Sequence, residues 1–376
     1  MKILIGGDFC ITPNYLQDNL IGDDVIALFK KSDLSIINLE CPITIDDSKN
    51  KIIKTGPHLR SDERIFDFLK KIHIDVVSLA NNHILDYGAP GLKHTFDFCL
   101  KNEIKFVGAG MSYKEASEPL FIEKENLKIA LINFCESEWS IAGNNTPGAN
   151  PLDLIENFNQ IKSAKKNADF VIVIIHGGHE YYDLPSPRMV KQYRFYAENG
   201  ADAIIGHHTH SIGGYEFRND VPIIYSLGNF LFTMENQNKK WYNGLIAELE
   251  IELNKKIKLN LIPVSQTMSS FNIFLPENKE KNAILEAVRE ANEVISNPVL
   301  LDEEWRKFKN KNHKMIHLLS PSNSLPGRYL RAAINRMGIN ELILNRKYLK
   351  TILNHFRCEA HRDILTQLIE ERISKK

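Results

Sequence analysis

Apolar and polar positions alternate in blocks along the first three quarters of the chain. Short runs rich in β-branched residues are typical of buried strands, and most of the stretches between these runs are typical of helices. The predicted strands are residues 2–6, 34–39, 74–80, 128–134, 170–175, 202–206 and 222–227. The predicted helices are residues 61–72, 91–101, 152–167 and 187–199, the first with Ser61 as its N-cap.

Strands that alternate with helices in this way are typical of an α/β layered fold, which is the fold class we expect. Residues 245–253 and 257–264, joined across residues 254–256, predict a closing antiparallel hairpin. After Pro276 the pattern indicates only helices, over residues 278–296, 301–317, 326–338, 342–356 and 359–373. We therefore expect two domains, residues 1–275 and a helical C-terminal extension of residues 276–376.

The composition is that of a globular protein, because 43% of the 376 residues are hydrophobic and 25% are charged. Lys plus Arg and Asp plus Glu number 47 each, and this zero net charge gives no support to nucleic-acid binding. Residues 306–350 depart from the balance, with 11 Lys and Arg against one Glu. This basic stretch is either a solvated helical face or a contact with an anionic partner, such as a polymer or a membrane surface.

The cysteines and the start of the chain indicate the compartment. Five scattered cysteines without a CxxC pair are typical of a reducing compartment. The first apolar run is too short for a signal peptide, and no stretch approaches the roughly 18 apolar residues that span a bilayer. The sequence therefore predicts a cytoplasmic protein, and the basic stretch leaves peripheral contact with a membrane open.

Side chains that bind metals follow several predicted strands at their carboxyl ends, where α/β sheets place their ligands. They are Asp8, Glu40, residues 81–83, His176 and residues 207–210. Each alone has a structural explanation, as a turn residue, a helix cap or a buried core histidine. Three imidazoles within residues 207–210 serve no packing purpose, however. Carboxylates, an amide and imidazoles together suit Zn, Mn or Fe better than Mg or Ca.

The same residues belong to an ordered set of motifs. These are GD at Asp8, NLE at Glu40, ANNHILDYG from Ala80, IHGGHEYY from Ile175, GHHTH from Gly206 and YSLGNF from Tyr225. The set resembles the CapA (poly-gamma-glutamate capsule biosynthesis) family, a branch of the calcineurin-like metallophosphoesterases. The resemblance covers approximately residues 1–265 and implies a four-layer α-β-β-α sandwich that carries a dinuclear metal centre.

The resemblance implies that the metal ligands are Asp8, Glu40, Asn82, His176, His208 and His210, with His207 as the competing register for the final histidine pair. Glu40 takes the place of the bridging carboxylate. Two departures matter for this centre. Cys10 stands where the superfamily often has a histidine, and Glu40 stands where it usually has an aspartate.

Other candidates for the site come from the same motifs and from the loop before them. The resemblance implies that His83 acts on the leaving group, while Asp86 either orients His83 or caps the next turn. Lys54 and His58 either hold an anionic substrate or lie in an exposed loop. The candidates for substrate binding are Lys54, His58, Glu136, Glu180, His207 and Asn229.

These residues predict a metal-dependent phosphoesterase-like hydrolase of capsule or surface-polymer biosynthesis. A water activated by two divalent cations (Mn, Zn or Fe) would attack a phosphoester, and His83 would protonate the departing oxygen. The expected partners are an anionic or phosphorylated polymer precursor and, through the basic stretch, capsule assembly machinery or a membrane surface. Two alternatives stay open: a non-catalytic metal-binding component of a polymer assembly complex, and an amide hydrolase or ligase partner that acts on poly-gamma-glutamate.

Overall fold

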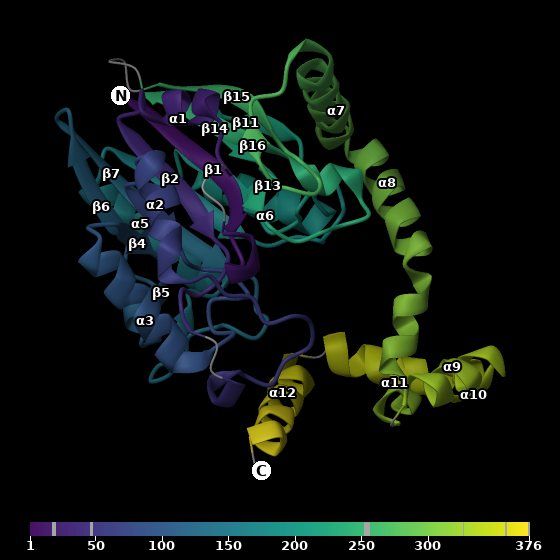
Figure 1. The fold of residues 1–376 in the computed structure, drawn as a ribbon. Helices are drawn as coiled ribbons and strands as arrows, with labels where there is room; N and C mark the ends of the chain where they lie inside the picture. The colour runs from purple at the N-terminus through teal and green to yellow at the C-terminus, as the bar shows by residue number, and fades with distance from the viewer. Residues whose placement is uncertain (17–19, 46–47, 252–255, 326, 358, 375–376) are drawn as a thin grey trace. The chain divides into compact units, whose positions relative to one another are not determined.

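Two mixed β-sheets form the centre of the first part of the chain in the computed structural model (Figure 1). The structure describes residues 1–16, 20–45, 48–251, 256–325, 327–357 and 359–374. The chain divides into two compact units, Met1–Glu303 and Glu304–Lys376. Strands and helices alternate along the first unit as the sequence predicts, so the α/β fold class is confirmed.

The first sheet comprises, in order, β16 (Ile273–Phe274), β15 (Ile257–Gln266), β14 (Asn243–Ile251), β1 (Lys2–Cys10), β2 (Leu34–Leu39), β3 (Val76–Ser78) and β4 (Lys105–Val107), with β13 (Asn229–Phe232) paired to the end of β1. β1 to β4 run parallel, so their carboxyl ends lie at one edge of the sheet. β14 and β15 pair antiparallel, which confirms the predicted hairpin. Asn254 and Lys255 of its expected turn lie outside the described residues.

The second sheet comprises, in order, β11 (Tyr215–Arg218), β12 (Val221–Ile224), β10 (Ala203–His207), β9 (Phe170–His176), β7 (Leu127–Cys135) and β6 (Leu120–Lys124). β7, β9, β10 and β12 run parallel. Every residue of β9 and β10 is buried, which is typical of parallel strands that are covered on both faces. β5 (Ala109–Gly110) and β8 (Gly148–Ala149) form a separate short ribbon.

Three clusters of buried apolar side chains hold these elements together. The first joins one face of the first sheet to α1 (Asp23–Phe29), α2 (Phe66–Lys71) and α3 (Gly88–Lys101). The second joins one face of the second sheet to α5 (Leu154–Asn167) and α6 (Pro187–Glu198). The third contains side chains of both sheets, among them Ile36 of β2 and Ile172 of β9, so the sheets share one core. Further short helices are α4 (Tyr113–Ala116) and the 3-10 helices η1 (Pro13–Tyr15), η2 (Ser48–Asn50) and η4 (Lys239–Tyr242).

The helix predicted over residues 61–72 is shorter and begins differently. A 3-10 turn, η3 (Glu63–Ile65), precedes α2. Its N-cap is Asp62, whose side chain accepts the backbone N–H of Arg64. Ser61, the predicted N-cap, is buried and donates its hydroxyl to the carbonyl of Ile11 at 2.6 Å. A buried hydroxyl forms a hydrogen bond with whichever acceptor lies near it in the folded protein, and the sequence does not show which acceptor that is.

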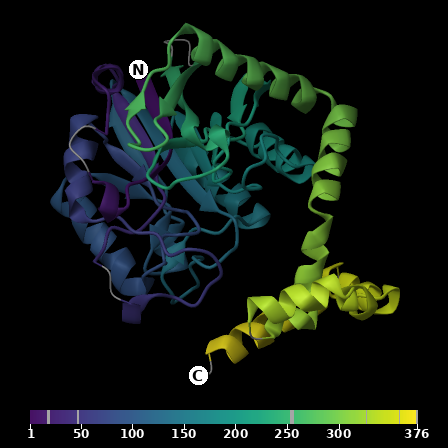
Figure 2. The ribbon, with the colours of Figure 1, turned by 45° about the vertical axis from the view of Figure 1, so that its right-hand side comes forward.

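The first unit continues past the predicted boundary after residue 275. α7 (Asn278–Ser296) lies against β11 and β15 (Figure 2), and Ile284 and Ile295 belong to the apolar clusters of the sheets. The side chain of Asn292 accepts the backbone N–H of Tyr215 at 2.6 Å. Gly214 permits this approach, because a side chain at that position would meet Ile295 and Asn292. The amphipathic pattern of residues 278–296 predicts the helix itself but not the surface on which it packs.

The described residues of the second unit are helical, as the sequence predicts for the C-terminal region. Its elements are η5 (His313–Leu319), η6 (Pro321–Ser324), α9 (Arg328–Arg336), α10 (Ile339–Ile343), α11 (Arg346–Arg357) and α12 (Glu359–Ser374), and α8 (Pro298–Lys311) precedes them. A search of the described residues finds no helix with the length and apolar character needed to cross a bilayer. The cytoplasmic location stays a prediction.

The packing of α7 predicts that Ile295→Ala destabilises the first unit. Ile295 is 1% exposed, and truncation of a buried Ile lowers the free energy of unfolding by about 2–5 kcal/mol. The matched control is Ile155→Ala on α5, since Ile155 is 69% exposed and its truncation should change stability by less than about 0.5 kcal/mol. Denaturant unfolding measures both values. Equal stabilities of the two variants would show that α7 is not part of this core.

Candidate metal centre

The predicted metal ligands meet where parallel strands of both sheets end. Asp8 lies near the end of β1, Glu40 follows β2, and His176 is the last residue of β9. His208 and His210 lie in the loop after β10. All five side chains are buried. Because β1 is parallel to β2 and β9 to β10, each sheet delivers its ligands to one edge.

Two groups of three side chains in the described part of the chain could each hold a cation, and both groups include Glu40. Glu40, His176 and His208 offer ligand atoms that all lie within 4.8 Å of one another, and so do Glu40, Asp8 and His210. Oε1 of Glu40 lies 3.7 Å from Nε2 of His176 and 3.6 Å from Nε2 of His210. Glu40 therefore stands between the two groups.

The surroundings of Glu40 fit a cation. Neither carboxylate oxygen has a hydrogen-bond partner among the described residues, although both are buried. Burial, and then the charges of Asp8 and Glu180, raises the pKa of Glu40 well above its usual range. Burial also lowers the pKa of His176 and His210, which favours the neutral rings that bind metals. A bound cation would compensate the buried carboxylate, which nothing else among the described residues does.

Two amides hold His176 from opposite sides. Oδ1 of Asn82 lies 3.1 Å from Nε2 of the ring, which places this predicted ligand beside the first group. Nδ2 of Asn38 lies 3.1 Å from Nδ1 of the ring and also donates to Oδ1 of Asp8 at 2.7 Å. Asn38 is not among the residues predicted from the sequence. Asn38 lies on β2 two residues before Glu40. Because alternate residues of a strand face the same side, this spacing could have indicated that Asn38 faces the site.

Backbone strain accompanies the histidine pair. His208 and His210 have φ values of 91° and 53°, in the left-handed region that residues with a Cβ seldom adopt. Such conformations cost about 1–3 kcal/mol each and persist where the surrounding structure fixes them. The backbone N–H of His208 donates to Oδ2 of Asp8 at 3.1 Å. Nδ1 of His210 lies 2.9 Å from Oδ1 of Asn229, whose amide nitrogen donates to the carbonyl of Trp241.

His83 follows the predicted ligand Asn82 in the chain, and its ring is held by two partners. Oδ2 of Asp86 lies 2.7 Å from Nδ1 of His83 and also accepts the backbone N–H of Leu59 at 2.6 Å. The ammonium of Lys54 forms an ion pair with Asp86 and lies 3.1 Å from the same ring nitrogen. The structure thus places the carboxylate of Asp86 against the ring of His83. Residues 53 and 55–57 of its loop are exposed, but the side chain of Lys54 is 2% exposed and is paired within the protein.

Two predicted substrate residues lie close to the cluster. His207 is buried at the end of β10, with Nδ1 3.2 Å from Oδ1 of Asp8. Burial raises the pKa of Asp8, but the contact with His207 and the charges of the other histidines outweigh burial, and the pKa lies well below its usual range. Glu180 is exposed, and its charge acts on Glu40 and His210.

Two others are engaged elsewhere. His58 donates from Nε2 to the carbonyl of Ile52 at 2.8 Å, a bond that holds its own loop. Glu136 forms an ion pair with Arg188 and accepts the backbone N–H of Gly178 at 3.0 Å. The structure therefore shows no contact of either side chain with the ligand groups.

A carboxylate that the sequence analysis missed, Glu138, lies at the edge of the cluster. Its Oε2 accepts from Nδ2 of Asn82 at 3.2 Å, and its Oε1 lies 4.0 Å from Nε2 of His208. Its side chain is 39% exposed, so it lies between the buried ligands and solvent. The run of residues 136–138 offered two carboxylates after one strand, and the sequence did not show which of them would turn toward the histidines.

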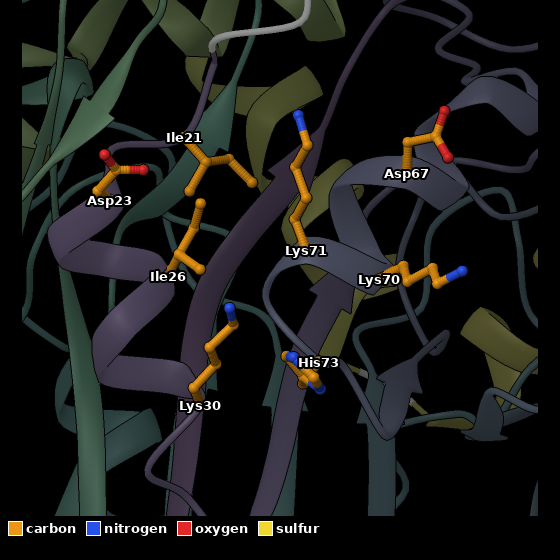
Figure 3. Close-up of a pocket in the computed structure, with 8 residues that line it drawn as sticks. All are labelled: Ile21, Asp23, Ile26, Lys30, Asp67, Lys70, Lys71 and His73. Carbon is orange, nitrogen blue, oxygen red and sulfur yellow. The ribbon is translucent and has the colours of Figure 1, made fainter.

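A separate cavity of about 600 Å³ lies at α1 and α2 of the first unit (Figure 3). It is lined by Ile21, Asp23, Ile26, Lys30, Asp67, Lys70, Lys71 and His73. None of the predicted site residues is among them. The lysines fall at or near the C-terminal ends of the two helices, where cations complement the helix dipole, and this accounts for them without a ligand.

An α/β fold that gathers buried carboxylates and imidazoles at its strand ends is consistent with the calcineurin-like metallophosphoesterase superfamily. Residues 5–234 match a family model described as "Bacterial capsule synthesis protein PGA_cap". This range is more than half of the chain and includes every predicted site residue. The chain therefore belongs to this family of bacterial capsule synthesis proteins, which confirms the family predicted from the motifs.

Curated relatives support the same family. The chain is 31% identical over 248 residues to "Capsule biosynthesis protein CapA" of Bacillus anthracis, covering 64% of this chain and 60% of the relative. It is 36% identical over 211 residues to "PGA biosynthesis protein CapA" of Bacillus subtilis, covering 55% of each. A third relative, "Probable polyglutamine synthesis accessory protein" of Mycobacterium tuberculosis, is 26% identical over 211 residues, covering 53% of this chain and 55% of the relative. The chain thus spans a little more than half the length of these relatives.

The shared carboxylate predicts the metal content. Protein purified without chelator and reconstituted with Mn or Zn should carry between one and two transition-metal ions per chain, measured by inductively coupled plasma mass spectrometry. Glu40→Gln should lose most of them, because glutamine keeps the shape of the side chain but removes the charge that both groups share. The control Glu123→Gln changes an exposed carboxylate of β6 and should keep its metal. A metal-free wild type would refute the centre, as would unchanged metal in Glu40→Gln.

Proposed function

We propose that this protein is a metal-dependent phosphoesterase-like hydrolase that acts in the biosynthesis of a capsule or another surface polymer. The observation that carries the proposal is the pair of ligand groups that share Glu40, together with His83, which follows the predicted ligand Asn82 in the chain and is held by Asp86. The names of the relatives support the biological process. The four-layer α-β-β-α arrangement is part of the proposal and is supported by the three apolar clusters.

The ligand groups define which residues would hold two divalent cations, which we expect to be Mn, Zn or Fe. Asp8, Glu40 and His210 would hold one, and Glu40, Asn82, His176 and His208 would hold the other. Two such cations, when bound, would polarise a phosphoryl oxygen and lower the pKa of a water molecule toward 7. Imidazole and carboxylate together favour these metals over Mg or Ca.

His83 is the proposed proton donor to the leaving group. Asp86 engages Nδ1 of the ring, which leaves Nε2 as the atom that would face a substrate. Lys54 neutralises Asp86, and the ion pair holds the carboxylate in place beside the ring. Lys54 was predicted to hold an anionic substrate, but this ion pair indicates another role. We assign Lys54 the role of positioning Asp86, and we assign recognition of an anionic substrate to the bound cations.

The proposed substrate is an anionic or phosphorylated precursor of the polymer, and the proposed partner is the machinery that assembles it. Glu138 and Glu180 place negative charge at the solvent side of the ligand cluster, so the attraction of the bound cations would have to outweigh it for an anionic group to enter. Asn229 would act indirectly, through its contact with His210.

A second candidate function is that of a non-catalytic metal-binding component of the assembly complex. Cys10 favours it, because this residue stands where the superfamily often supplies a histidine. Hydrogen bonding to Cys41, and then burial, raises the pKa of Cys10 well above its usual range, so the side chain stays a thiol. The accessory role in the name of the mycobacterial relative points the same way. Turnover in a screen of phosphomonoesters and phosphodiesters, run on protein of measured metal content, decides between the two candidates.

The role of His83 predicts that catalysis and metal binding separate in His83→Asn. The variant should keep the metal content of the wild type and lose turnover by about 10²–10⁴-fold, the usual contribution of a general acid. The loss should be smaller for an aryl phosphate whose leaving group needs no proton. His94→Asn is the control, since His94 lies on α3 and pairs with the exposed Glu63. Loss of metal in His83→Asn would mean that His83 is a ligand and that its assignment is wrong.

A further inference from the structure

Two helices of the second unit are basic and contain no acidic residue. α9 carries three arginines and α11 carries four Lys and Arg. Residues 304–376 as a whole hold 16 Lys and Arg against six Asp and Glu, whereas residues 1–303 hold 31 against 41. The chain as a whole is neutral, but its charge is divided unequally between the two compact units.

The same two helices also leave apolar side chains exposed. Of the 28 large apolar side chains that are exposed among the described residues, 15 lie in the second unit, which holds 73 of the 376 residues. Tyr329 and Leu330 of α9 and Leu353 and Phe356 of α11 are among them. Ile334 of α9 is buried, so part of the apolar face of α9 is used inside the unit.

The basic and apolar positions of α11 lie on different sides of the helix. At 3.6 residues per turn, Leu349, Leu353 and Phe356 share one side, while Lys347 and Lys350 lie on the other. α9 is built in the same way, with Leu330 and Ala333 apart from its arginines. A helix with segregated basic and apolar sides and low net hydrophobicity is typical of segments that lie in the interface of a membrane.

We infer that α9 and α11 bind the surface of a bilayer that contains anionic lipid. The basic side chains complement the headgroups, and the exposed Leu, Tyr and Phe side chains enter the boundary between headgroups and acyl chains. A soluble polyanion would use the charges but not these apolar side chains, and for this reason we choose lipid. Anionic lipid is thus a more specific partner than the assembly machinery named in the proposed function. The test measures lipid binding, so its result does not depend on whether the protein has phosphoesterase activity.

The test is cosedimentation of the full chain with vesicles of equal parts phosphatidylcholine and phosphatidylglycerol at low salt. The wild type should bind these vesicles and not vesicles of phosphatidylcholine alone. Reversal of Arg328, Arg331 and Arg336 to Glu should weaken binding by on the order of 100-fold. Leu353→Ser combined with Phe356→Ser should weaken binding by about 10-fold or more, because those side chains no longer enter the bilayer.

The cavity of Figure 3 supplies a matched control. Reversal of Lys30, Lys70 and Lys71 to Glu makes the same change of charge in the first unit and should leave vesicle binding unchanged. Equal melting temperatures and metal contents would show that all variants are folded. Absence of wild-type binding to the anionic vesicles overturns the inference. So does binding that survives the two serine substitutions while soluble polyglutamate competes with the vesicles, since the surface would then be a site for polyanions.

Discussion

The site depends on the burial of one carboxylate that the protein itself does not compensate. Glu40 has no hydrogen-bond donor among the described residues and lies beside a second buried carboxylate, Asp8. Imidazole nitrogens of His176 and His210 lie 3.7 and 3.6 Å from Oε1 of Glu40, in rings whose pKa burial lowers. An arrangement of this kind is unfavourable without positive charge, and it is well suited to cations held between the two sheets. The positions of Asn38, Asn82 and the histidine pair all follow from keeping these groups in contact.

The first strand is shaped to deliver Asp8 to that point. The pairing of β1 with β2 and with β13 shifts register around Asp8, which marks a local bulge. Gly7 makes the bulge sterically feasible, since a Cβ there would lie 2.1 Å from the carbonyl oxygen of Gly228. The backbone N–H of Asp8 then donates to that same carbonyl at 3.0 Å. Gly7 is therefore part of the site, although it carries no functional group.

Much of this arrangement could be predicted from sequence because strand ends are local features. Leu34–Leu39 has the predicted bounds, and the side chains expected after the strands do meet. Contacts between distant segments could not be predicted. The pairing of Lys54 with Asp86, the turning of Glu138 toward Asn82 and the packing of α7 on the sheets depend on tertiary distances that no local pattern carries. The hydrogen bond of Ser61 could not be predicted for the same reason, because its hydroxyl donates to the carbonyl of Ile11, fifty residues earlier in the chain.

The proposed bridging position of Glu40 is tested most directly by anomalous diffraction from crystals loaded with Mn. Two anomalous peaks are expected, both in contact with the carboxylate of Glu40. One of them should also contact Asp8 and His210, and the other His176 and His208. A single peak that does not touch Glu40, or peaks only outside this cluster of side chains, would contradict the view that one shared carboxylate organises the site.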